Sequence, residues 1–210
     1  MEKLFLPGWG APADLYRPAL AHGWSVLEPP RFRDAPDLAS CRAWLARELD
    51  RLDRPAWLAG HSMGGALAVL AAADDPARIA RLTLISPAGL PLEKPLGASA
   101  ADFAGQLVAG RYAARHAASA LRRVAAAPRA ALRLAREVRA LDLSAEMAAV
   151  RRGGVDVEVV ACASDTLVTP AHCRRQATLL GARYRLLPLV GGHMWMLAGP
   201  EHLVALLEPR

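Results

Sequence analysis

The sequence is poor in several features that mark particular classes of protein. Only 5% of its 210 residues are aromatic, and no apolar run is long enough for a transmembrane helix. The three cysteines, Cys41, Cys162 and Cys173, form no CxxC pair and are odd in number. We therefore expect neither a disulfide framework nor a metal site, and reduced cysteines with structural roles.

Lysine is also scarce, because Lys3 and Lys94 are the only lysines among 26 basic residues. The formal net charge is +6, and residues 101–152 hold ten arginines against four acidic residues. Few aromatic side chains that could stack on bases accompany these arginines, so we expect no nucleic-acid platform. A solvated helical surface is expected instead. The alternative is a basic rim that favours substrates on an anionic carrier, such as acyl carrier protein or CoA.

The first ten residues contain one basic residue and a short apolar run, with no small-residue cleavage site after it. We therefore expect no secretory signal, and we expect the protein to be located in the cytoplasm. Hydrophobic residues, in contrast, make up 53% of the sequence. With this length and composition, we expect residues 1–210 to form one compact domain.

Short apolar segments alternate with longer helical ones along most of the chain. Strands are predicted at 3–6, 24–27, 56–59, 82–86, 155–161 and 184–187. Helices are predicted at 37–52, 64–73, 170–180 and 200–208. This alternation is typical of a parallel sheet with helices on both faces.

Residues 90–150 break the alternation, because they are rich in alanine and arginine and contain no strand pattern. Near their end Arg129, Arg133 and Arg136 share one helix face, opposite an apolar stripe. We expect a helical cap insertion that packs through this stripe over the edge of the sheet. Connecting helices would show the same stripe and stay the alternative.

The segment "LAGHSMGGA" places Ser62 between glycines, after a predicted strand and before a predicted helix. In such a turn, residues two positions away on each side come too close for side chains, which explains Gly60 and Gly64. The hydroxyl would stand at the carboxyl end of the sheet beside helical N–H groups. The pattern favours a nucleophile, and a plain glycine-rich turn is the alternative; His61, held on the same turn, would point elsewhere.

A serine nucleophile needs a base to take its proton and an acid to orient that base. His193 lies in a Gly-rich loop after the last predicted strand, and Asp165 lies in the loop after the fifth. Both loops reach the same edge of the sheet, so we predict a triad of Ser62, Asp165 and His193. A structural histidine and a helix-capping aspartate are the alternatives, although Thr169 before Pro170 is the better predicted cap.

The motifs "LFLPGWG", "GHSMGG", "SDTLVTP" and "GGHMWM" together resemble the α/β-hydrolase superfamily over nearly the whole chain. The combination of "PGWG" with a helical insertion resembles the pattern of small carboxylesterases such as the pimeloyl-acyl-carrier-protein methyl ester carboxylesterases. The resemblance implies an α/β-hydrolase fold with a shortened, mostly parallel sheet of about six strands. It also implies an oxyanion hole from the backbone N–H groups of Met63 and Trp9, and no cofactor.

Three features depart from the family pattern. Pro7 stands where many members have histidine before Gly8, so a hydrogen bond that braces this loop is missing. Members usually have two antiparallel strands before the "LFLPGWG" strand, at which this chain begins. The segment "LEPPRFRD" lacks the usual Asp-x-x-Gly-x-Gly-x-Ser loop, which alters the wall of the pocket.

We interpret the chain as a serine hydrolase that cleaves carboxylic esters through an acyl-enzyme. Trp9, Met194 and Trp195 flank the predicted oxyanion and base loops, so we expect them to form an acyl pocket for uncharged esters with short to medium chains. Ordinary core packing is the alternative for these side chains. Thioester cleavage, C–C bond hydrolysis or lyase chemistry with the same triad stays open, as does a non-catalytic ligand-binding or receptor role.

Overall fold

The computed structural model describes residues 1–17, 20, 23–92, 94, 97–98, 101–102, 105 and 113–207. A six-stranded sheet with the order β2-β1-β3-β4-β5-β6 forms its centre, and all five neighbouring pairs are parallel. The strands are β1 (Glu2–Leu6), β2 (Trp24–Val26), β3 (Ala56–His61), β4 (Ile79–Ile85), β5 (Asp156–Cys162) and β6 (Arg183–Leu187). This confirms the predicted α/β class and the predicted sheet.

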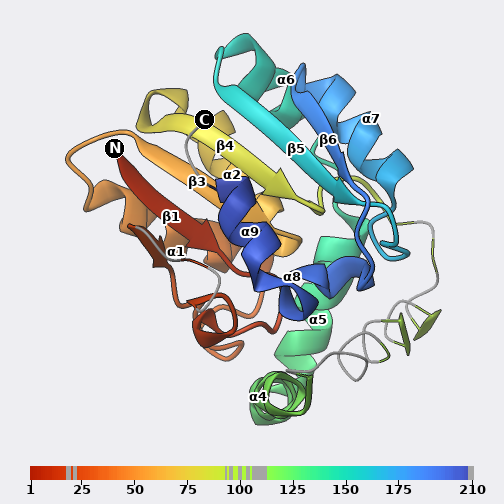
Figure 1. The fold of residues 1–210 in the computed structure, drawn as a ribbon. Helices are drawn as coiled ribbons and strands as arrows, with labels where there is room; N and C mark the ends of the chain where they lie inside the picture. Colours follow the sequence, from red (N-terminus) through yellow and green to blue (C-terminus); the bar gives the residue numbers. More distant parts are fainter. Residues whose placement is uncertain are drawn as a thin grey trace.

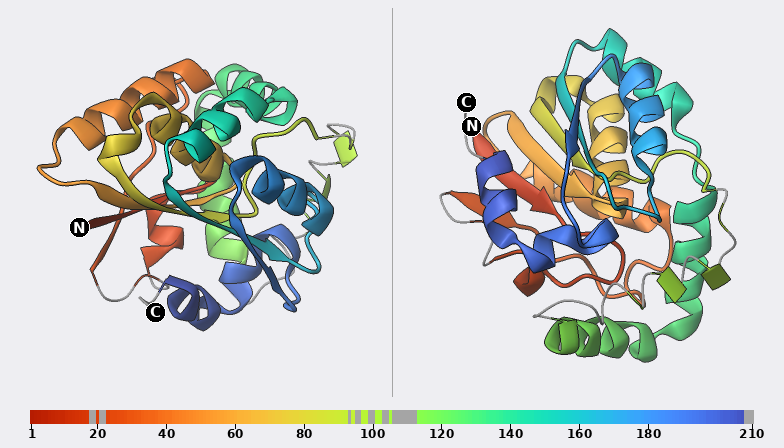
Figure 2. Two further views of the ribbon diagram at one scale, coloured as in Figure 1. Left: turned by 90° about the horizontal axis from the view of Figure 1, so that it is seen from above. Right: turned by 45° about the vertical axis from the view of Figure 1, so that its right-hand side comes forward.

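Helices cover both faces of the sheet (Figures 1 and 2). One face carries α1 (Leu38–Asp50), α2 (Met63–Asp74), α6 (Ser144–Arg152) and α7 (Pro170–Leu180). The other face carries η1 (Ala13–Leu15), α8 (Trp195–Ala198) and α9 (Pro200–Leu207). Two more α-helices, α4 (Ala113–Ala126) and α5 (Pro128–Ala140), lie beyond the carboxyl ends of the strands, toward which the arrowheads point in Figure 1. Two short 3-10 helices, η3 (Pro76–Arg78) and η4 (Gly192–Met194), precede β4 and α8.

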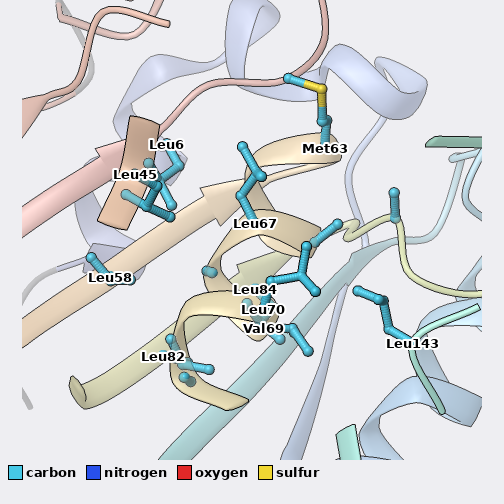
Figure 3. Close-up of a cluster of buried hydrophobic side chains, with 14 of the residues drawn as sticks. Leu6, Leu45, Leu58, Met63, Leu67, Val69, Leu70, Leu82, Leu84 and Leu143 are labelled. Atoms are coloured by element: carbon cyan, nitrogen blue, oxygen red, sulfur yellow. The ribbon is translucent and has the colours of Figure 1, made fainter. Parts of the chain in front are cut away.

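The core has two parts because successive strand residues point to opposite faces. Leu58 of β3 packs in the first cluster, with α1, α2, α6 and α7, whereas the next residue, Ala59, packs in the second, with α8 and α9. Figure 3 shows leucines of the first cluster between the sheet and α2. Both faces of β3 are buried throughout, as expected for a central parallel strand.

Strand β4 begins at Ile79, three residues before the predicted start. Arg81 interrupts the apolar pattern, but its guanidinium lies 4.4 Å from the ring centroid of Trp57. It also lies 3.6 Å from a carboxylate oxygen of Asp156 and 3.8 Å from one of Glu158, both on the neighbouring strand. These cross-strand partners allow a charged residue to continue the strand.

The predicted insertion divides into two parts. Leu134 and Val138 of α5 are buried in the first cluster, so the apolar stripe packs as expected. Helix α6, in contrast, packs against α2 and α7 as one of the helices that cover the sheet. Residues 93, 95–96, 99–100, 103–104 and 106–112 of this stretch, and position 208 of the last predicted helix, lie outside the described residues.

Candidate active site

Ser62 forms the turn between β3 and α2. Its backbone has φ 54° and ψ −118°, a strained conformation for a residue with a side chain. The Ser62 N–H donates to the carbonyl of Ile85 at 3.0 Å, while the Ser62 carbonyl accepts from the N–H groups of Gly65, Ala66 and Ala88. These four hydrogen bonds hold the strained residue in place.

The glycines beside Ser62 are required by close backbone contacts. A Cβ added to Gly60 would overlap the carbonyl of Gly64, and one added to Gly64 would overlap the carbonyl of Leu6. Real Cβ atoms do not make such contacts with rigid backbone. The expected crowding two residues on either side of Ser62 is confirmed.

The Ser62 hydroxyl has no part in capping the helix that follows it. Serine before a helix usually accepts a hydrogen bond from an N–H of the first turn, but here no side-chain cap bond forms at α2. Met63 is the first residue of α2, where the helix itself offers its N–H no acceptor. A hydroxyl that does not cap and an N–H at the helix start suit a nucleophile beside an oxyanion donor.

The structure brings the predicted acid and base together. Asp165 Oδ2 lies 2.8 Å from His193 Nδ1, and both side chains are buried. The other carboxylate oxygen, Oδ1, accepts from the N–H groups of Leu167 and Val168, each at 2.9 Å. Asp165 therefore does not cap α7; Thr169 does, accepting from His172 N–H as predicted.

The environment keeps the Asp165 carboxyl in its charged form. Burial acts to raise its pKa, but the facing His193 ring and the hydrogen bonds from His193 and Val168 hold this pKa below its usual range. Because a carboxylate only accepts hydrogen bonds, the proton lies on His193 Nδ1, and Nε2 is the basic nitrogen of the ring.

His61, the residue before Ser62, has partners of its own. Its Nε2 lies 3.0 Å from the His193 carbonyl oxygen, and its Nδ1 lies 2.8 Å from the hydroxyl of Tyr16. The His61 and His193 rings are 4.6 Å apart between centroids. These contacts place the loop that carries His193 beside the turn that carries Ser62. Tyr16 was not singled out by sequence reasoning, since nothing local marks a tyrosine ten residues after a strand as part of a site.

The loop after β1 also lies against the turn that carries Ser62. A Cβ placed on Gly8 would be 3.0 Å from His61 Nδ1 and 3.4 Å from Ser62 Cβ. The Gly8 carbonyl accepts from Ala11 N–H at 3.1 Å, and in a trans peptide the Trp9 N–H points the opposite way. The Trp9 indole donates to the Ala131 carbonyl of α5 at 3.1 Å, which joins this loop to the insertion.

A narrow apolar cleft opens beside these loops. Gly8 and Met63, from the two predicted oxyanion segments, line it together with Phe32, Trp44 and Arg123. The space inside is about 20 Å³, close to the room that one water molecule needs. In Figure 3 the Met63 side chain points away from the labelled leucines of the first cluster.

Arg123 of α4 holds the loop between β2 and α1 at one side of the cleft. Its guanidinium donates to Glu28 Oε1 at 2.7 Å and to the carbonyls of Pro29 and Pro30. Glu28 Oε2 in turn accepts from Ala13 N–H at 3.1 Å. A helix of the insertion therefore supports this loop.

Met194 and Trp195 lie in the second core cluster. They are 3% and 1% exposed and pack with residues such as Phe5 and Leu203. The cleft lined by Gly8 and Met63 does not include them. The structure thus gives both side chains a packing role, and a part in acyl binding stays a prediction for them.

Residues 4–206 match the Alpha/beta hydrolase family, and the chain belongs to this family. The fold, the strained serine turn and the buried acid and base pair agree with that membership. A comparison with curated proteins gives no match.

Solved structures with the same fold have low sequence identity to this chain. A lipase-esterase related protein from Clostridium acetobutylicum aligns with TM-score 0.77 and 10% identity, over 97% of this chain and 91% of that one. An N-formylmaleamic acid deformylase from Pseudomonas putida S16 aligns with TM-score 0.75 and 16% identity, over 99% and 91%. A putative non-heme bromoperoxidase from Mycobacterium tuberculosis aligns with TM-score 0.71 and 20% identity, over 98% and 89%.

Two further classes of site were searched for among the described residues. No group of three or more His, Cys, Asp or Glu side chains in this part of the chain is arranged to hold a metal ion. None of its helices combines the length and apolar character needed to cross a bilayer.

Proposed function

We propose that this member of the Alpha/beta hydrolase family cleaves carboxylic esters with Ser62 as nucleophile, His193 as base and Asp165 as the acid that orients it. Ser62 Oγ attacks the ester carbonyl carbon while His193 Nε2 takes the serine proton. The tetrahedral intermediate collapses, the C–O bond to the leaving group breaks, and His193 returns the proton to the alcohol. Water then attacks the acyl-enzyme in the same way and releases the acid.

The observation that carries this proposal is the buried 2.8 Å contact between Asp165 and His193, beside a strained serine whose hydroxyl caps no helix. Asp165 fixes the tautomer in which Nε2 is basic and stabilises the imidazolium that forms in the transition state. The strained backbone of Ser62, held by four backbone hydrogen bonds, supports a catalytic role because such strain is concentrated at active sites.

The N–H groups of Met63 and Trp9 are the proposed oxyanion donors. Met63 N–H begins α2, and the Gly8–Trp9 peptide is oriented by the bond from Ala11 N–H to the Gly8 carbonyl. Each such donor contributes on the order of 3 kcal/mol to transition-state stabilisation in comparable sites.

A fluorophosphonate probe and a panel of substrates test the proposal on the unmodified chain. We expect covalent labelling of Ser62, identified by peptide mass spectrometry, and hydrolysis of p-nitrophenyl esters. Matched thioesters and C–C substrates in the same panel test the alternative reactions of the same triad. Absence of both labelling and turnover would indicate the non-catalytic binding role instead.

The cleft supports a preference for small, uncharged acyl groups. Its walls are mainly apolar, and the guanidinium of Arg123 is occupied by Glu28 and two carbonyls. Because the space has room for about one water molecule, acyl chains longer than acetyl would have to move a wall. Each methylene that the cleft accommodates contributes about 0.8 kcal/mol.

Replacing Trp44 of α1 with alanine is expected to shift the preference toward longer esters. The enlarged cleft would accept several more methylenes, so the ratio of kcat/KM for octanoate over acetate p-nitrophenyl esters should rise about tenfold or more. Trp24→Phe, at the start of β2 and outside the residues that line the cleft, is the matched control and should leave the ratio unchanged. If the ratio shifts with Trp195→Phe and not with Trp44→Ala, the acyl group lies beside the loop that carries His193.

We also propose that exposed arginines of the insertion attract substrates on an anionic carrier. Fewer arginines are available for this role than the three that share a face of α5 in the sequence. Arg133 donates to Asp37 at 2.9 Å and to Glu137 at 3.0 Å. These ion pairs join α5 to the start of α1, and they neutralise the charge of Arg133. Arg129 and Arg136 are exposed on the same helix, and they are the residues on which this part of the proposal rests.

A further inference from the structure

Three buried hydrogen bonds connect three parts of the site in series. These parts are the loop after β1, the turn that carries Ser62, and the loop that carries His193, which we call the base loop. Gly8 N–H lies 3.4 Å from the Tyr16 hydroxyl oxygen. That hydroxyl lies 2.8 Å from His61 Nδ1, and His61 Nε2 lies 3.0 Å from the His193 carbonyl oxygen. His61 lies 45 residues after Tyr16, and His193 lies a further 132 residues along the chain, so the series exists only in the folded chain.

The direction of every hydrogen bond in the series follows from its last member. A carbonyl oxygen can only accept, so His61 Nε2 carries a proton and donates to His193. Neutral His61 then has Nδ1 as an acceptor, and the Tyr16 hydroxyl must donate to it. The Tyr16 oxygen is left to accept from Gly8 N–H. One arrangement of protons satisfies all three contacts.

The surroundings favour this single arrangement. Tyr16 is fully buried and His61 is 1% exposed, with the Tyr16 ring packed on Phe5 at 4.7 Å between centroids. Burial, with a smaller effect of the His193 ring, lowers the pKa of His61 to about 3, and burial raises the pKa of Tyr16. Asp165 is the acidic group acting on His61 and partly offsets this shift. Both side chains therefore keep their neutral forms near neutral pH.

The series also holds the loop in which Pro7 precedes Gly8. Proline has no backbone N–H and no polar side chain with which to brace this loop. In the structure the Gly8 N–H is held by Tyr16 and the Gly8 carbonyl is held by Ala11 N–H. Both the N–H and the carbonyl of Gly8 are thus held by hydrogen bonds. Because the Gly8 carbonyl belongs to the same peptide unit as the Trp9 N–H, the orientation of that N–H is fixed as well.

We propose that Tyr16 and His61 are positioning residues for hydrolysis, which set the oxyanion loop at Gly8 and Trp9 against the backbone of the base His193. Neither side chain reacts. Tyr16 orients the loop that carries one proposed oxyanion donor, and His61 transmits that position to the base loop. The inference rests on the proposed function, because it assigns a role within that reaction.

Tyr16→Phe tests the proposal, because it keeps the ring that packs on Phe5 and removes only the hydroxyl. We expect kcat for a p-nitrophenyl ester to fall about tenfold to a hundredfold, with KM little changed, since small misplacements of reacting groups have effects of this size. Affinity for a trifluoromethyl ketone, whose oxyanion occupies the same hole, should fall in parallel. Affinity for the product acid should not.

Tyr184→Phe is the matched control, because the Tyr184 hydroxyl makes a comparable bond to the Pro170 carbonyl, at 3.2 Å, away from this series. It should leave kcat and ketone affinity unchanged. At His61, glutamine keeps one donor and one acceptor whereas leucine keeps neither. His61→Gln should therefore retain more of kcat than His61→Leu.

The outcomes separate the two levels of the proposal. If the unmodified chain hydrolyses the ester and Tyr16→Phe behaves like Tyr184→Phe, the positioning role is overturned while the proposed function stands. Equal loss of kcat in His61→Gln and His61→Leu, with equal thermal stability, would also count against it. If the unmodified chain neither reacts with the probe nor hydrolyses the ester, the proposed function and this inference fail together.

Discussion

Replacing Ser62 with alanine is expected to lower kcat by about a millionfold while leaving the fold intact. The positions beside Ser62 offer no other hydroxyl or thiol, because they are glycine, histidine and methionine. The loss should fall on kcat, since binding of the substrate does not depend on the hydroxyl. The measurement is hydrolysis of a p-nitrophenyl ester, alongside covalent labelling by the fluorophosphonate.

The folded state should tolerate this change because the Ser62 hydroxyl caps no helix, and the bonds that hold the turn are all made by backbone atoms. Alanine at φ 54° keeps the same Cβ, so the change adds no clash. Ser144→Ala, which removes a hydroxyl bonded to Asp142, is the control and should not affect hydrolysis. Turnover by Ser62→Ala near that of the unmodified chain would exclude Ser62 as nucleophile.

Asp165→Asn is expected to lower kcat by about four orders of magnitude. An asparagine amide can donate to His193 Nδ1, and the ring would then place its proton on Nε2, the nitrogen that must be basic. The two acceptor bonds from Leu167 and Val168 N–H can be kept by the amide oxygen, so the loop should persist. His193→Ala should be nearly as damaging, because it removes the base itself.

Asp142→Asn is the matched control for Asp165→Asn. Asp142 accepts from the Ser144 N–H and hydroxyl at the start of α6 and has no contact with His193 among the described hydrogen bonds. We expect this variant to retain full activity and a normal dependence of kcat/KM on pH. If Asp165→Asn were as active as Asp142→Asn, another group would have to orient His193.

The elements that could be predicted from sequence are those whose cause is local. A strand needs an apolar run, and the turn at Ser62 needs Gly60 and Gly64, so both can be located in the printed sequence. Asp165 and His193 could also be proposed as partners, because loops after parallel strands open at one edge of the sheet. Their 2.8 Å contact is consistent with that reasoning.

The features that sequence reasoning missed depend on partners far along the chain. The Tyr16 hydroxyl meets a histidine 45 residues away, and no spacing rule predicts such a pair. Arg81 continues β4 only because Trp57, Asp156 and Glu158 lie beside it in the sheet. Helix α6 has an apolar face like that of α5, and the pattern alone does not tell which helix covers the sheet and which lies beyond its end.

The bond from the Trp9 indole to the Ala131 carbonyl joins two segments through a main-chain oxygen. A substitution at position 131 changes the side chain but leaves this acceptor in place, so the amino-acid sequence of α5 can diverge without losing the link. Grafting a different insertion between β4 and β5 would replace the segment that supplies this carbonyl. Exchanging insertions to obtain new substrate preferences would therefore also disturb the loop after β1, unless the donor segment offers a carbonyl at the same place.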